Sequence, residues 1–180
     1  MRKLILLSLL TLAFSCNNVG KFQEAINTLS SDWDAATAQV TDVVGKISQS
    51  QELGKTALQT VNPDEMAMAK MNDEQKAKVE SIKQSLQEQI GSLGQLAQTA
   101  FEFVNKWQTE GEKLTALKEG LANKKLPKDV QATIDSLKSM ADTATQNASS
   151  WNEQVASATA AINQASQSYN DLMSSIPMSK

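Results

Sequence analysis

The chain has 180 residues, of which 41% are hydrophobic and 21% charged, and its formal net charge is −3 at neutral pH. This length suits one domain with its own core, and the acidic balance excludes the strong positive field of a typical nucleic-acid-binding domain. Histidine is absent and there is one cysteine, which excludes His-based catalytic triads and the usual zinc, copper and iron ligand sets.

The remaining residue types give no pattern of a catalytic or cofactor site. Carboxylates are spread singly along polar helix faces, and no glycine-rich phosphate-binding loop is present. We therefore expect a protein that is not an enzyme and that holds no metal or cofactor.

The first sixteen residues have the composition of an export signal. Arg2 and Lys3 form a basic start, residues 4–14 form an apolar run, and small Ser15 precedes Cys16, the only cysteine. The apolar run is too short to span a bilayer as a helix.

The segment Leu12-Ala13-Phe14-Ser15-Cys16 resembles the lipobox of bacterial lipoproteins, although Ala13 and Phe14 depart from its usual residues. The resemblance implies that residues 1–15 are a signal peptide and that Cys16 becomes the mature N-terminus, carrying acyl chains such as palmitate. Residues 16–19 would then be a short tether to the membrane. Each buried methylene contributes about 0.8 kcal/mol, so several chains would attach the protein permanently. Ala13-Phe14-Ser15 also fits ordinary secretory cleavage, which is the alternative.

Three long segments carry apolar residues that alternate at spacings of three and four, which is typical of helices with a coiled-coil-like stripe. They predict helices over about 20–60, 73–122 and 127–176. In the third segment the pattern is unbroken and consists of Val130, Ile134, Leu137, Ala141, Ala144, Ala148, Trp151, Val155, Ala158, Ile162, Ala165, Tyr169, Leu172 and Ile176. In the first, Ser50 and Gly54 interrupt it.

Two corners containing proline separate these segments. At the first, Asn62 is the expected cap of a short helical turn, and Asn72 with Gln75 resembles a capping box that starts the second helix. At the second, Pro127 is expected to open the third helix.

The fold class predicted is all-α, an elongated antiparallel three-helix bundle over residues 20–180, about 70 Å long at 1.5 Å per residue. A parallel coiled coil between chains is the alternative, but short connections between long helices favour a monomer. Folding the chain near residues 66 and 125 places Trp33 and Trp151 on either side of Ala100. All three tryptophans are expected in the core rather than on a ligand platform.

Two surfaces are candidates for function. Lys124, Lys125 and Lys128, between the second and third helices, fall at the anchored end and are candidates for contact with anionic lipid headgroups; the alternative is a solvated loop. A methionine cluster at the other end is a candidate protein-partner surface, or else a cap on the bundle. It consists of Met66, Met68, Met71, Met173 and Met178.

Together these features predict a lipid-anchored, non-enzymatic cell-envelope protein that presents a helical rod to a protein partner. The membrane is the second partner, through the lipid, and nucleic acid is not expected. The outer membrane is favoured, with its periplasmic or surface face open. The alternatives are a surface-exposed adhesin that binds a host ligand and, less favoured, a membrane-inserting toxin.

Overall fold

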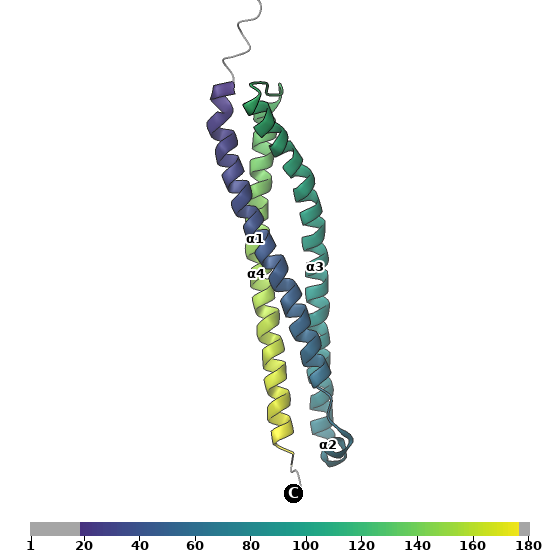
Figure 1. Ribbon diagram of the computed structural model, residues 1–180. Helices are drawn as coiled ribbons and strands as arrows, with labels where there is room; N and C mark the ends of the chain where they lie inside the picture. The colour runs from purple at the N-terminus through teal and green to yellow at the C-terminus, as the bar shows by residue number, and fades with distance from the viewer. Residues whose placement is uncertain (1–18, 177–180) are drawn as a thin grey trace, which may run out of the picture. The chain divides into compact units, whose positions relative to one another are not determined.

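The computed structural model describes residues 19–176, and this part of the chain contains helices and no strand. Four helices pack against one another, which confirms the predicted all-α class (Figure 1). Their bounds are α1 Val19–Thr60, α2 Glu65–Lys70, α3 Asp73–Ala122 and α4 Val130–Ser174.

The ends of the helices differ in two places from the sequence prediction. The cap of α2 is Asp64, not Asn62, because the Asp64 side chain accepts a hydrogen bond of 2.7 Å from the backbone N–H of Ala67. Helix α4 begins at Val130, three residues after Pro127, and its first turn closes where the Thr133 N–H donates to the Asp129 carbonyl.

The start of α3 is formed as the sequence predicts. The backbone N–H of Gln75 donates to the Asn72 side chain over 2.8 Å, and the Asn72 N–H donates to the Gln75 side chain over 3.0 Å. This reciprocal pair is a capping box, and it satisfies donors that would otherwise lack partners at the end of the helix.

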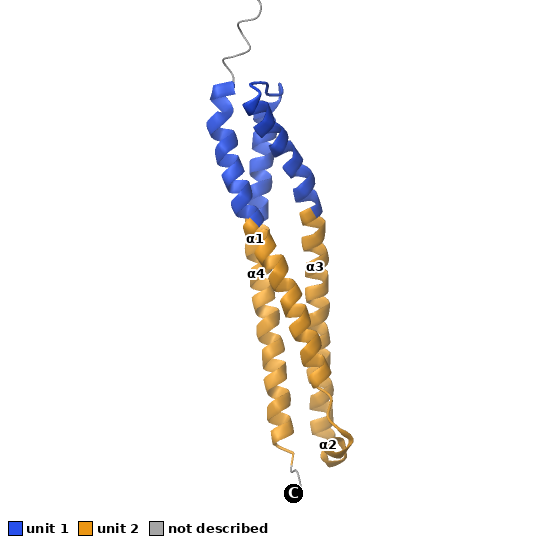
Figure 2. Ribbon diagram, viewed as in Figure 1, with its two compact units in different colours: residues 1–37, 105–144 blue, residues 38–104, 145–180 orange. Residues whose placement is uncertain are grey.

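The chain divides into two compact units, each containing segments of α1, α3 and α4 (Figure 2). Unit 1 comprises residues 1–37 and 105–144, and unit 2 comprises residues 38–104 and 145–180.

In unit 1 the core is centred on two stacked indoles. The Trp33 and Trp107 rings lie 3.5 Å apart between centroids, and their planes differ by 12°. The Trp107 indole N–H donates to the Thr37 hydroxyl, which donates in turn to the Trp33 carbonyl, so the polar group of the Trp107 ring is satisfied.

The position of this pair corrects the predicted register. Trp33 meets Trp107, not the region of Ala100. In unit 2 the centroids of the Trp151 and Phe103 rings lie 5.6 Å apart, and the rings are nearly perpendicular. The three tryptophans are buried, at 7% exposure or less, as expected for core residues.

In unit 2 the two interruptions of the first apolar stripe are explained by their neighbours. Ser50 is buried, and its hydroxyl lies 2.8 Å from that of Thr159 on α4, so the polar group has a partner. At Gly54, an added Cβ would lie 2.9 Å from Ile90 Cγ1, so the absence of a side chain lets α1 approach α3 closely.

All fourteen positions of the stripe predicted over residues 130–176 are buried. Among the described residues, no buried side-chain nitrogen or oxygen lacks a hydrogen-bond partner. The helices thus bury their apolar stripes without leaving polar groups unsatisfied.

Candidate functional site

The loop between α3 and α4, at one end of unit 1, carries the predicted basic site. Helix α3 ends with two hydrogen bonds: the Lys125 N–H donates to the Gly120 carbonyl over 2.7 Å, and the Lys124 N–H donates to the Leu121 carbonyl over 3.2 Å. This pair of bonds is a Schellman motif, which reverses the chain directly after the helix.

Lys124 occupies the position in this motif that glycine usually fills. Its φ is 53°, in the left-handed region, and it is the only residue other than glycine with a positive φ in residues 19–176. A residue with a Cβ is destabilised there by about 1 kcal/mol or more. The chain therefore keeps a lysine at this turn although its backbone conformation favours glycine.

The lysines of the loop are available to an external partner. Lys124, Lys125 and Lys128 are exposed, and none forms an ion pair with another residue of the described chain. Residues 113–128 contain five lysines and one acid, Glu119, giving a local net charge of +4. This segment is strongly basic within a chain that is acidic overall.

A groove of about 720 Å³ lies beside the loop, between the end of α3 and the start of α4. Its lining is mostly apolar or small, with lysine, acid and hydroxyl groups added. The lining residues are Lys113, Ala116, Leu117, Lys125, Leu126, Pro127, Asp129, Ala132, Thr133 and Ser136.

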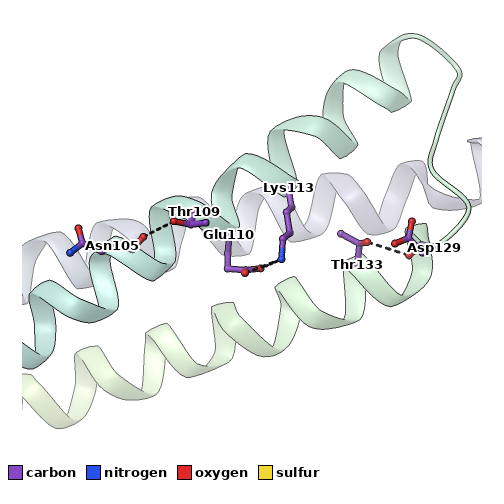
Figure 3. A network of polar contacts seen from close by, with 6 residues as sticks. All are labelled: Asn105, Thr109, Glu110, Lys113, Asp129 and Thr133. Atoms are coloured by element: carbon purple, nitrogen blue, oxygen red, sulfur yellow. Dashed lines mark hydrogen bonds and ion pairs between the residues drawn. The ribbon is translucent and has the colours of Figure 1, made fainter.

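Polar contacts lie within each wall of this groove (Figure 3). The Lys113 ammonium lies 2.9 Å from both carboxylate oxygens of Glu110, one turn earlier on α3. On α4, the Thr133 hydroxyl donates to the Asp129 carbonyl over 3.2 Å. Lys113 and Thr133 thus belong to opposite walls, as Figure 3 shows.

The start of α1 belongs to the same unit as the loop and lies at the same end of it (Figure 1). The Lys118 ammonium, near the end of α3, lies 3.1 Å from the Ser30 hydroxyl on α1. Lys21 lies 5.6 Å from the centroid of the Phe22 ring, a cation–π distance. The predicted lipid-attachment residue, Cys16, lies outside the described residues.

The methionine cluster is only partly accessible. Met66 is 68% exposed and Met68 is 37% exposed, whereas Met71 is 4% exposed and Met173 is half-buried. Met71 follows α2 and its backbone N–H donates to the Ala67 carbonyl, so it belongs to the core at this corner. Met71 therefore offers no surface to a partner. Met178 lies outside the described residues.

One ionisable group has a shifted pKa. Burial raises the pKa of Tyr169 above 10.0; a hydrogen bond with the backbone of Asn62 opposes this shift, and the charge of Asp64 adds to it. The phenol thus stays neutral at physiological pH and helps to join α4 to the corner after α1.

No group of three or more acidic, histidine or cysteine side chains within residues 19–176 could hold a metal ion. No helix of the described part has both the length and the apolar character needed to cross a membrane. The sequence pattern does not predict the groove, because the groove depends on how the end of α3 and the start of α4 pack around the loop. Small Ala116 and Ala132 on either side of the Leu126-Pro127 turn were the available signal.

Comparison with known proteins does not assign the site. No protein-family model, curated protein or solved structure matches this chain.

Proposed function

We propose that this chain is a lipid-anchored, non-enzymatic protein of the bacterial cell envelope, which presents a helical bundle to a protein partner. The observation that carries the proposal is the basic and apolar start of the chain, followed directly by the only cysteine, Cys16. Acylation of Cys16 would attach the protein to a membrane, with the outer membrane favoured.

The arrangement of unit 1 supports a membrane-facing end. Cys16 is three residues before α1, and the start of α1 lies at the same end of the unit as Lys124, Lys125 and Lys128. Each lysine close to an anionic membrane surface contributes about 1 kcal/mol of attraction, so the loop would add to the hold of the lipid.

The architecture we propose is an elongated, monomeric, antiparallel three-helix bundle with coiled-coil-like packing. Contacts within each unit support it. In unit 1, Trp33 contacts Trp107, and Ser30, earlier on α1, contacts Lys118, later on α3. Helices α1 and α3 therefore run in opposite directions. In unit 2, the Lys46 ammonium donates to the Asn152 side chain over 3.0 Å, and Ser50, later on α1, contacts Thr159, later on α4. Helices α1 and α4 therefore run in the same direction.

Small-angle scattering of the non-acylated protein tests the proposed architecture. A compact globular profile or an obligate oligomer would contradict it.

The exposed methionines Met66 and Met68 are the candidate contacts for the protein partner, since flexible thioethers adapt to varied surfaces. Replacing both with serine should weaken capture of the partner without lowering the melting temperature. Variants that bind as before would move the partner surface elsewhere.

Fractionation of cells tests the anchor. The wild-type protein should partition with membranes and take up a labelled palmitate analogue, and the Cys16→Ala variant should do neither. A variant that still partitions with membranes contradicts the proposal. Protease treatment of intact cells then distinguishes a periplasmic protein, which is protected, from a surface-exposed adhesin, which is lost.

A further inference from the structure

The groove between α3 and α4 combines two chemical characters. Half of its ten lining residues are apolar, and among them Leu126 is half-buried, so part of its side chain is open to a ligand. The apolar lining residues are Ala116, Leu117, Leu126, Pro127 and Ala132. Its volume of about 720 Å³ lies within the range of sites that hold drug-sized molecules. A groove of this volume with several apolar lining residues favours an occupant with a hydrocarbon portion.

The lysines of the groove and of the adjacent loop favour an anion. Lys113 and Lys125 line the groove together with one acid, Asp129, and the Lys113 ammonium is paired with Glu110, so the uncompensated positive charge comes from Lys125 and the exposed loop lysines. The Lys113 ammonium has three N–H donors, of which two bond to the Glu110 carboxylate, so one remains for a ligand. Lys125 forms no ion pair within residues 19–176. Lys124 and Lys128, exposed on the same loop, extend the positive field.

The Schellman turn gives a second, independent observation. It holds Lys124 at φ 53°, where glycine would be unstrained, and places it next to the lining residue Lys125. A residue with an unfavourable backbone conformation often marks a functional position, and Lys124 adds a positive charge beside the lining residue Lys125.

We propose that this groove binds one anionic phospholipid, with its phosphate held by Lys113 and Lys125 and part of an acyl chain against Leu126 and Ala132. The lipid would come from the membrane in which the chain is anchored, so this inference rests on the proposed function. A free phosphate has no apolar portion to contact the apolar lining residues. A phospholipid without net charge lacks the negative charge that the lysines attract.

The test uses the full-length Cys16→Ser protein, which cannot carry the lipid anchor. Short-chain dihexanoyl phosphatidylglycerol is titrated below its micelle concentration, and binding is followed by calorimetry and by NMR shifts of backbone amides. We expect saturable binding of one molecule with shifts centred on Ala116, Leu126 and Ala132. Dihexanoyl phosphatidylcholine and inorganic phosphate should each bind at least about tenfold more weakly.

Two kinds of variant assign the binding to the groove. The Lys113→Gln/Lys125→Gln protein should lose about tenfold to thirtyfold in affinity for the phosphatidylglycerol probe. Lys125→Gln alone should show a smaller loss. Ala132→Trp, at an exposed position in the lining, should fill the groove and abolish binding without changing the charge. The charge-matched control is Lys55→Gln/Lys78→Gln, which changes two exposed lysines of unit 2 and should bind as wild type.

Several results would overturn the proposal. These are equal binding of phosphatidylcholine, equal binding of phosphate alone, or an equal loss of affinity in the control variant, which would indicate general surface attraction. Unchanged binding by Ala132→Trp in a protein with wild-type helicity would overturn it as well. None of these depends on whether Cys16 is acylated, so failure of the groove and failure of the anchor can be told apart.

Discussion

At the scale of single residues, the glycines show how local space decides the effect of a side chain. Gly91 lies in the interior of α3 and has no neighbour within 4 Å of the place where a Cβ would stand. At Gly120, a Cβ would lie 2.8 Å from the backbone carbonyl oxygen of Lys125, which forms the turn after α3. The same substitution should therefore have opposite effects at the two positions.

We predict that Gly91→Ala raises the free energy of unfolding by about 1 kcal/mol, because alanine favours the helix and meets nothing. Gly120→Ala should lower it by about 1–3 kcal/mol, because the turn must shift to relieve the contact. Denaturant unfolding of both variants measures the difference. A stabilising Gly120→Ala would show that the turn is not held as described.

The methionines give a similar matched pair. Met71→Ser should destabilise the protein by about 2–5 kcal/mol, because a buried apolar side chain is truncated. Met66→Ser, at a position that is 68% exposed, should change the free energy of unfolding by less than about 0.5 kcal/mol. Thermal melts of the two variants check this, and equal losses would contradict the separation of the cluster into core and surface.

The single tyrosine predicts a pH dependence of stability. Burial raises the pKa of Tyr169 above 10.0, so the folded protein holds the phenolic proton more tightly than the unfolded chain does. The associated stability is present below pH 10 and is lost as the pH rises through the folded-state pKa. Between about pH 8 and about pH 11, wild type should lose more stability than Tyr169→Phe.

Because the chain has one tyrosine, absorbance of the tyrosinate reports this group alone. A pH titration of the native protein should give a pKa above 10.0, and denaturant should return it to the ordinary value. A native value at or below 10.0 would contradict the upward shift, and would show that the hydrogen bond with Asn62 outweighs burial.

At the scale of the helices, burial of the apolar stripes is the feature that holds the structure. Two positions on α4 are each 5% exposed: Ile134 in unit 1 and Val155 in unit 2. Aspartate at either position should destabilise the protein by several kcal/mol, since it places an unpaired charge in the core. Ser157→Asp, at an exposed position of the same helix, is the control and should be nearly neutral. Unfolding by urea measures all three.

The ends of the long helices could be predicted from the sequence because their signals are local. Alternating apolar spacing, the Asn72–Gln75 box and the prolines depend on neighbouring residues only. Helix α4 starts later than expected, because the chain passes Pro127 in a turn before the helix bonds form.

The register between helices could not be predicted in the same way. In unit 2, contacts of Gly54 with Ile90 and of Gln51 with Gly94 place the end of α1 opposite about Gln84. The first turns of α3 therefore extend past α1, and the short α2, with Ala67 buried, is part of this corner. Symmetric folding of the sequence about residue 66 ignores this offset, which is why Trp33 was expected near Ala100.

At the scale of the whole molecule, charge is distributed unevenly between the two units. The described residues of unit 2 contain six lysines and eleven acids, a net charge of −5. The described residues of unit 1 contain eight lysines and nine acids, a net charge of −1, and five of these lysines fall in residues 113–128. Both units are thus acidic overall, and the cluster of lysines in unit 1 is a local feature next to the turn between α3 and α4.

The candidate site was predictable in part. The basic loop follows from the lysines around Pro127, but the burial of Met71 and the groove depend on packing that no local pattern encodes. The proposed lipid anchor rests on residues 1–16, where the only cysteine follows residues with the composition of an export signal.

Mass spectrometry of the mature N-terminus, in protein purified from bacterial membranes, tests this claim most directly. We predict that the mature chain begins at Cys16 and that its mass exceeds that of residues 16–180 by the mass of a lipid modification with several acyl chains. A mature chain that begins elsewhere, or one that begins at Cys16 with an unmodified thiol, would contradict the proposed anchor.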